Sequence, residues 1–172
     1  MIHIGDYSTK GTIHIHYPLS ELWIGKFTII AENLTVLLGG EHPTTAATIY
    51  PFPDIFPDSI PQKPSTFSKG DVHIGNDCWV GRDVTILSGV TLGDGCIVGT
   101  AAVVTKSFPP YSIIGGNPAK LIRLRCSADE VAFLLQLRWW DWPIEQIIEN
   151  CSLLQGPLNL LTAAFPPTKK PQ

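Results

Sequence analysis

Residues 74–109 read IGNDCW, VGRDVT, ILSGVT, LGDGCI, VGTAAV and VTKSFP, which are six consecutive hexads in one register. Each hexad begins with an aliphatic residue, and the second position is glycine in four of the six. The fifth position is small or β-branched in the first five hexads. Self-similarity at a short fixed period is the signature of a repeat architecture, so this stretch predicts a repeat fold.

A period of six is typical of neither a helix nor a lone strand. Apolar residues recur every three or four positions in a helix and every two in a strand. A period of six keeps the alternation of a strand and leaves room for a corner. We therefore predict that each hexad is a short strand and a turn. The first residue points inward, the glycine permits the corner, and the fifth residue fills the space beside it. Three hexads then close one triangular coil.

The coil extends upstream of these hexads. IGKFTI, IAENLT and VLLGGE begin at positions 24, 30 and 36 and supply another coil, and Ile4-Gly5 begins a rougher one. We expect about four coils in total. Cys78 and Cys96 lie one coil apart, so both are predicted to be small core residues without a reactive role. A stack of parallel coils has open ends and an apolar outer face, so oligomerisation or a terminal cap is expected.

Composition narrows the function class. With 172 residues, 44% of them hydrophobic and 16% charged, one substantial core is expected. The net charge of −3 and the scattered Lys and Arg residues indicate no nucleic-acid partner. No membrane span or signal peptide is recognisable, which predicts a soluble cytoplasmic protein. The four cysteines lack the close spacing of a zinc site or a disulfide framework and are read as reduced, mostly buried thiols.

The hexads are interrupted between about residues 42 and 72. This segment contains six prolines and no hexad, and the repeat restarts at Ile74. We predict an excursion loop, and long loops inside compact domains are often functional. His42 stands at its root, directly after Gly39, Gly40 and Glu41, where a side chain can be both fixed and accessible.

The sequence becomes helical after the coil. Ser127 and Glu130 form a capping box that opens a run through Leu137, and Pro143 opens a second run closed by Gly156. We expect Trp139, Trp140 and Trp142 to pack within this cap. The predicted organisation is a β-helix domain over 1–125, a C-terminal helical cap over 126–156, and a loosely ordered tail over 157–172.

The combination of hexads, GGEHP followed by YPF, IGNDCWVG, IIGGNPAK and WWDWP resembles the xenobiotic acetyltransferase branch of the hexapeptide-repeat acyltransferases, which includes the chloramphenicol and streptogramin acetyltransferases. The resemblance spans about residues 4–155. It implies a left-handed parallel β-helix, a homotrimer with active sites between subunits, and acetyl-CoA as the donor. It also implies that His42 is the catalytic base. The short loop and the unfamiliar tail are departures in regions that shape the acceptor pocket.

The residue types fit this chemistry. Moving an acetyl group from a thioester to an alcohol requires a base that takes the hydroxyl proton, and an imidazole, with an ordinary pKa near ~6.5, can do so. No covalent enzyme intermediate is needed. The oxyanion requires a donor, such as a backbone N–H at a glycine-containing corner, which the sequence does not identify. Glu41 is a neighbour of His42 in sequence, although its side chain need not point the same way.

Candidate donor-binding residues lie downstream. Trp79 occupies an outward-facing sixth position and is a candidate for the pantetheine arm or for a subunit interface. Small residues at 100–102 allow a ligand to approach the backbone, and Lys106 and Lys120 are candidates for the CoA phosphates. The full set of donor candidates is Trp79, Thr100, Ala101, Ala102, Lys106, Asn117, Pro118, Lys120 and Arg123. No metal is expected.

Two alternatives from other classes remain. β-Helix carbonic anhydrases bind zinc through histidines between subunits, and this chain carries His3, His14, His16, His42 and His73, but it lacks the HxxxxH spacing of that group. A catalytically inactive trimeric scaffold is the second alternative, against which the presence of His42 and Trp79 argues. The identity of the acceptor, whether an antibiotic, a sugar or another alcohol, is left open.

Overall fold

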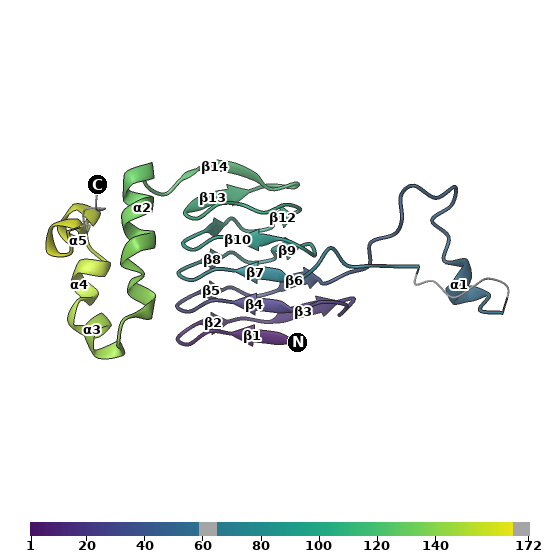
Figure 1. The fold of residues 1–172 in the computed structure, drawn as a ribbon, viewed down its shortest axis with the longest axis horizontal. Coiled ribbons are helices and arrows are strands. Elements are labelled where there is room, and N and C mark those ends of the chain that lie inside the picture. Colours follow the sequence, from purple (N-terminus) through teal and green to yellow (C-terminus); the bar gives the residue numbers. More distant parts are fainter. Residues whose placement is uncertain (59–64, 167–172) are drawn as a thin grey trace, which may run out of the picture. The chain divides into compact units, whose positions relative to one another are not determined.

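The structure is a computed structural model that describes residues 1–58 and 65–166. The chain divides into two compact units, Met1–Arg123 and Leu124–Gln172. The first unit is a parallel β-helix (Figure 1). Its strands are β1 (Ile2–Ile4), β2 (Thr9–Lys10), β3 (Ile13–His16), β4 (Leu22–Ile24), β5 (Ile29–Ile30), β6 (Leu34–Leu37), β7 (Val72–Ile74), β8 (Trp79–Val80), β9 (Thr85–Ile86), β10 (Thr91–Leu92), β11 (Ile97–Val98), β12 (Val103–Val104), β13 (Ser112–Gly115) and β14 (Lys120–Leu124).

Three sheets form the sides of the coil, and strands of successive coils pair in parallel. Sheet A has the order β1-β4-β7-β10, sheet B the order β14-β13-β11-β8-β5-β2, and sheet C the order β12-β9-β6-β3. Ile74 pairs with Leu92, Val80 with Val98, and Ile86 with Val104, so each residue meets the equivalent position one coil later. The prediction of a hexapeptide β-helix of about four coils is confirmed, and β13 and β14 extend sheet B beyond the last complete coil.

The interior is built from the positions that the repeat singles out. All six aliphatic residues that begin the hexads from Ile74 to Val104 are at most 2% exposed. Cys78, Val84, Val90, Cys96 and Ala102 fill the fifth positions and are equally buried. Burial raises the pKa of the Cys78 thiol, which keeps it protonated and inert. Cys126 is only half-buried and Cys151 is exposed, so the expectation of mostly buried thiols holds for two of the four.

The turns differ from the predicted role of glycine. The residue with positive φ is the fourth of each of the first five hexads, including Asp77 (φ 52°), Asp83 (φ 58°) and Ala101 (φ 59°). The second-position glycines serve a different need, because a Cβ at Gly75 would lie 2.6 Å from the backbone nitrogen of Asp94. Stacking of one coil on the next therefore requires the glycine, while the corner itself is made two residues later.

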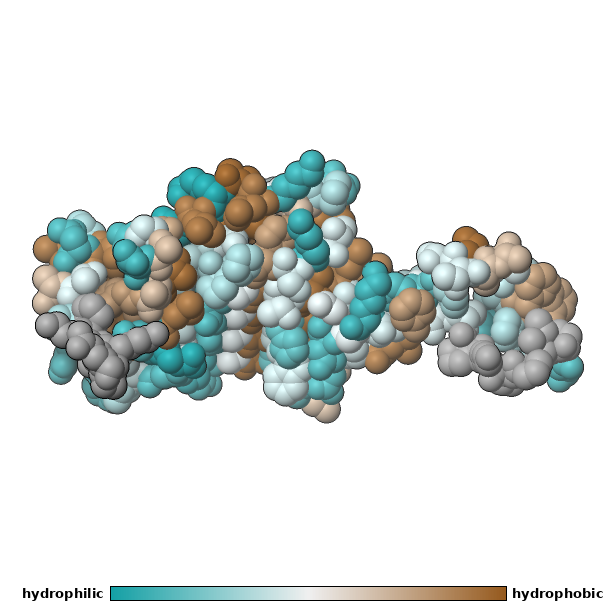
Figure 2. Space-filling view, turned by 45° about the horizontal axis from the view of Figure 1, so that its top comes forward, coloured by the Kyte–Doolittle hydropathy of each residue, from teal (hydrophilic) through white to brown (hydrophobic). Residues whose placement is uncertain are grey.

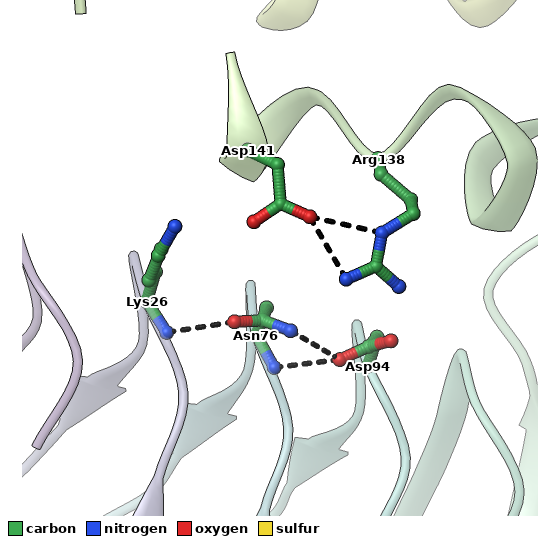
Figure 3. A network of polar contacts seen from close by, with 5 residues as sticks. All are labelled: Lys26, Asn76, Asp94, Arg138 and Asp141. Carbon is green, nitrogen blue, oxygen red and sulfur yellow. Dashed lines mark hydrogen bonds and ion pairs between the residues drawn. The ribbon is translucent and has the colours of Figure 1, made fainter. Parts of the chain in front are cut away.

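Polar side chains join the coils at the corner between sheets A and B. Asn76 accepts a hydrogen bond from the Lys26 backbone N–H at 2.8 Å through Oδ1. Its own backbone N–H and Nδ2 both donate to Asp94 Oδ1 at 2.8 Å (Figure 3). The turn N–H groups of successive coils are thus satisfied by a ladder of side-chain oxygens, which is what buried or half-buried backbone donors require.

The second unit is helical. It contains α2 (Ala128–Leu137), the 3₁₀ turn η1 (Trp139–Asp141), α3 (Ile144–Glu149), α4 (Cys151–Leu154) and α5 (Leu158–Ala164). The capping box of Ser127 and Glu130 is present. Arg138 ends α2 in the left-handed region, and its Nε donates to Asp141 Oδ2 at 2.9 Å (Figure 3).

Two helical expectations need correction. The run predicted from Pro143 to Gly156 is two helices, because Asn150 interrupts it with its backbone N–H and side-chain Nδ2 both donating to the Gln146 carbonyl. The tail expected to be loosely ordered from 157 contains α5, whose Leu161 is 3% exposed. Pro157 directly precedes α5, and a proline at a helix start removes no hydrogen bond within the helix. Residues 167–172 lie outside the described residues. The role of these helices as a cap stays a prediction.

Between β6 and β7 the chain leaves the coil in the excursion loop (Figure 1). Within its described residues, 42–58 and 65–71, the loop carries one short helix, α1 (Phe52–Ile55), which the sequence pattern did not indicate. In the described part of the chain, no helix has the length and apolar character needed to cross a bilayer.

Candidate active site

The root of the loop is packed against the first coil. A Cβ at Gly39 would lie 2.8 Å from Leu19 Cδ1, and a Cβ at Gly40 would lie 2.6 Å from the Tyr17 ring. Gly40 also has φ +88°. The glycine pair therefore lets the chain pass closely over Tyr17 and Leu19. This close approach explains why glycines stand at positions 39 and 40, shortly before His42.

Backbone hydrogen bonds close the loop at its base. The Glu41 N–H donates to the Phe67 carbonyl at 3.2 Å, and the Phe67 N–H donates to the Glu41 carbonyl at 2.8 Å. These two residues form an isolated antiparallel bridge. The outgoing and returning chains are thus held together immediately before His42, so His42 is the first residue beyond a closed base.

Serine side chains fasten the returning chain to the coil. Ser20 Oγ lies 2.9 Å from both the Leu38 and the Gly70 carbonyl oxygens, and Ser68 Oγ donates to Ser20 Oγ at 3.0 Å. Ser88 Oγ accepts from the Lys69 N–H at 3.1 Å. The loop base is therefore anchored to the coils before and after it.

His42 combines fixation with access. Its side chain is half-buried, and its Nδ1 atom is buried without a hydrogen-bond partner among the described residues. An imidazole that is not committed to a structural hydrogen bond can exchange a proton with a ligand, subject to what orients its tautomer. The position predicted from sequence, a histidine at the junction of coil and loop, agrees with this geometry, while its catalytic role is not tested by the geometry.

Trp79 lies on the outer face of sheet B, as its position in the hexad predicts. It is 53% exposed and pairs with Ile29 on one side and Ile97 on the other, and Ile97 pairs with Ile113. We call Ile29, Trp79, Ile97 and Ile113 the apolar stripe. The indole is therefore one member of a row of apolar side chains and does not stand alone on the coil surface.

The small residues at 100–102 divide into two kinds. Thr100 and Ala101 are exposed at the turn after β11. Ala102 is fully buried, and its carbonyl accepts the Thr85 N–H at 2.9 Å. A ligand can therefore approach Thr100 and Ala101, whereas the side chain of Ala102 belongs to the core and faces away from one.

The remaining candidates cluster near the end of the coil. Lys106 is exposed and its Nζ lies 5.6 Å from the centroid of the Phe108 ring. Asn117 and Pro118, joined by a cis peptide bond, form an exposed turn before β14, and Lys120 and Arg123 are exposed on β14. The Val103 N–H donates to Gly116 and the Ala119 N–H donates to Val103, so this turn is tied to β12, which precedes Lys106.

Sequence reasoning missed Ser88 and Phe67 as neighbours of the site. Ser88 occupies the third position of its hexad and is 4% exposed, and its Oγ donates to Glu41 Oε1 at 2.5 Å. The serine between Ile86 and Val90 indicates a hydrogen bond, because a buried hydroxyl needs a partner. The sequence does not identify that partner.

Other surface features do not coincide with the site. A hollow of about 380 Å³ lies over sheet A and the neighbouring corner, lined in part by Trp23, His73, Asn76 and Asp94, and it includes neither His42 nor a donor candidate. Among residues 1–58 and 65–166, no three His, Cys, Asp or Glu side chains are grouped so that they can hold a metal ion.

Comparison with known proteins identifies the family. The family described as bacterial transferase hexapeptide (six repeats) matches residues 71–106. A probable macrolide acetyltransferase of Lysinibacillus sphaericus is 43% identical over 155 residues, covering 86% of this chain and 84% of that protein. A chloramphenicol acetyltransferase of Agrobacterium fabrum is 40% identical over 130 residues, covering 73% of this chain and 62% of that protein.

A solved structure agrees with these relatives. The galactoside acetyltransferase in complex with coenzyme A is 28% identical and superposes with a TM-score of 0.56, covering 75% of this chain and 57% of that one. The hexapeptide coil, together with these relatives, places the chain among the acyltransferases of the β-helix class. The chain belongs to the hexapeptide-repeat acetyltransferases and is an acyltransferase enzyme.

Proposed function

We propose that this enzyme transfers the acetyl group of acetyl-CoA to a hydroxyl group of a small-molecule acceptor, with His42 as the general base. The observation that carries the proposal is the placement of His42 directly beyond the closed base of the loop, on the scaffold of a hexapeptide acetyltransferase. A residue in that place is fixed by the coil and still reaches a ligand.

The reaction follows from one proton transfer. The imidazole of His42 takes the acceptor hydroxyl proton as the oxygen attacks the thioester carbonyl, which gives a tetrahedral oxyanion. The oxyanion collapses with cleavage of the carbon–sulfur bond, and the proton passes to the departing CoA sulfur. The products are the acetyl ester and free CoA. A backbone N–H is the expected donor to the oxyanion.

The loop supports an acceptor with an apolar surface. Tyr50 and Phe52 make an edge contact with ring centroids 4.8 Å apart, and Phe56 lies 6.1 Å from Phe52. All three rings are at least 40% exposed, together with Ile49 and Ile55. Figure 2 shows hydrophobic residues on the surface of the loop. The names of the relatives suggest a macrolide or chloramphenicol, and a sugar hydroxyl remains the other candidate.

For the donor, we propose that Lys106 and Lys120 meet the phosphates of CoA, with Arg123 nearby on β14. Trp79, Thr100, Ala101, Asn117 and Pro118 are then contacts along the pantetheine arm. The exposure of these side chains supports the proposal. Ala102 is buried, so its side chain does not contact the donor and only helps to hold Thr100 and Ala101 in place.

We further propose a homotrimer with its active sites between subunits, which acts in the cytoplasm. The apolar stripe on sheet B supports a packing surface, because four adjacent outward positions carry isoleucine or tryptophan. His42 lines neither of the two hollows described on the single chain, the one over sheet A and the one at Ile55–Asp58. In the proposed trimer a neighbouring subunit would form a further wall beside it. Light scattering at micromolar concentration should give the mass of three chains, and a monomer would contradict this assembly.

The activity is tested by incubating the purified protein with acetyl-CoA and a panel of chloramphenicol, a macrolide, a streptogramin and simple sugars. Free CoA is measured with a thiol reagent, and the acceptor is examined for the mass of one added acetyl group. We expect thiol release that depends on one acceptor class and is unaffected by a chelator. Absence of release with every acceptor, or zinc-dependent hydration of carbon dioxide, would reject the proposal.

A further inference from the structure

The side chain of Glu41 is bound to the coil and not to its neighbour in sequence. Ser88 Oγ donates to Glu41 Oε1 at 2.5 Å and accepts from the Lys69 N–H at 3.1 Å. Ser88 is 4% exposed. The hydroxyl thus joins both chains at the loop base to the coil that follows the loop.

This contact constrains the residue that follows. Glu41 is in a β-bridge with Phe67, and consecutive side chains of an extended chain point to opposite sides. When the Glu41 carboxylate is held toward Ser88, the next side chain is directed away from that contact. The rotation of the chain at Glu41 therefore sets the direction in which His42 leaves the loop base.

The arrangement carries a cost that a purely structural contact would avoid. Glu41 Oε2 is buried and has no hydrogen-bond partner among the described residues. Leaving a carboxylate oxygen buried and unpaired destabilises the folded state, and an apolar residue would avoid this penalty. A polar pair kept at such a cost next to a functional residue is consistent with a role in geometry.

We propose that Glu41 and Ser88 are positioning residues for His42. The Ser88 hydroxyl fixes the Glu41 carboxylate, and the fixed carboxylate sets the direction of the imidazole. The proposal rests on the proposed function of His42 as the base, and neither Glu41 nor Ser88 takes part in proton transfer to the substrate.

The variants that test this are Ser88→Ala, Glu41→Ala, their double variant and Glu41→Gln. We expect Ser88→Ala and Glu41→Ala each to lower kcat about tenfold, with the Michaelis constant for acetyl-CoA unchanged, since the geometry of the base and not donor binding is altered. The double variant should be no slower than Glu41→Ala, because the two residues act as one unit. Glu41→Gln should retain most of the activity, because its amide oxygen can still accept from Ser88.

The chain offers a matched control. Thr12 Oγ1 donates to Glu32 Oε2 at 3.0 Å, which is also a contact between a hydroxyl and a carboxylate of successive coils, at the corner between sheets B and C. Thr12→Ala and Glu32→Ala should change the melting temperature and leave kcat unchanged. Equal kcat in wild type, Ser88→Ala and Glu41→Ala would overturn the proposal, as would equal loss of kcat in the control pair.

An imidazole NMR spectrum separates this proposal from the proposed function. The resonances of His42 are assigned by their disappearance in His42→Ala. They should shift or broaden in Ser88→Ala and Glu41→Ala and stay in place in Thr12→Ala. Unchanged His42 resonances in Ser88→Ala would overturn the positioning role. A wild type without acetyl transfer would reject the function, and the spectra would still decide the positioning.

Discussion

Two corners of the same coil use the same kind of contact for different ends. At the corner between sheets B and C, Glu32 accepts hydrogen bonds from the backbone N–H and the hydroxyl of Thr12, and the chain crosses from β5 to β6 through residues 31–33. At the corner between sheets C and A, Glu41 accepts from Ser88, and the chain departs into the excursion loop. A hydrogen bond between a carboxylate and a hydroxyl of an adjacent coil thus occurs at both corners. Its effect on catalysis depends on whether the residue that it holds lies next to the proposed base.

The largest loss of activity is expected when the loop is removed. Because Glu41 and Phe67 are bridged, residues 42–66 can be replaced by an Asn-Gly turn that joins them directly. We expect acetyl transfer to fall below detection, since the base and the aromatic surface are both lost, while circular dichroism and the cooperative melt of the coil persist. Measurable turnover in this variant would show that the chemistry lies elsewhere.

The next effect concerns the coil alone. Ile86 is fully buried between Val36 and Val104, so Ile86→Ala should lower the free energy of unfolding by about 2–5 kcal/mol. Ile29, with 53% of its surface exposed, has the same side chain on the outside, and Ile29→Ala should cost about 0.5 kcal/mol or less in an isolated chain. Denaturant melts at one fixed protein concentration measure both. A larger loss for Ile29→Ala would indicate that the apolar stripe is covered by another subunit.

A smaller change is expected for donor binding. Replacing both Lys106 and Lys120 with Ala should raise the Michaelis constant for acetyl-CoA by roughly tenfold, the value of one charge-assisted contact. The increase should be smaller for an analogue lacking the 3′-phosphate. Lys10→Ala, on the exposed strand β2, is the control. Equal increases for the two donors would reject this assignment.

The smallest expected effect is a pH dependence of the melting temperature that arises from Glu32, at the corner between sheets B and C. The backbone and side-chain hydrogen bonds from Thr12 lower the pKa of Glu32. A carboxyl group with a lowered pKa in the folded state contributes stability above its unfolded pKa and loses that contribution as the pH falls through the folded value. The melting temperature of wild type should therefore exceed that of Thr12→Ala slightly at neutral pH, and the gap should narrow in acid. A gap that is constant with pH would contradict this cause.

The coil was predictable because its repeat is a local constraint. Ile74, Val80 and Ile86 are buried for a reason that is present in every hexad, so periodicity alone places them. The loop base was predictable only in part. His42 could be placed where the hexapeptide repeat is interrupted. The contact between Glu41 and Ser88 joins residues far apart in the sequence, and no periodic pattern specifies it. The pattern of the tail does not predict helix α5, because the prolines near its end indicate an irregular chain. Pro157, directly before α5, is the one signal of a helix start.

In this enzyme the coil provides the fold, and we propose that His42, at the loop base, provides the catalytic base. The most direct test is kcat for His42→Ala on an established acceptor, measured across pH and alongside the melting temperature. We expect turnover to fall by about 10²- to 10⁴-fold, the usual contribution of a positioned base, and the acid limb of the wild-type pH profile to disappear. The melting temperature and the Michaelis constant for acetyl-CoA should stay close to those of wild type, with His14→Ala and His16→Ala as fully active controls. Near-normal turnover by a folded His42→Ala enzyme would contradict the account.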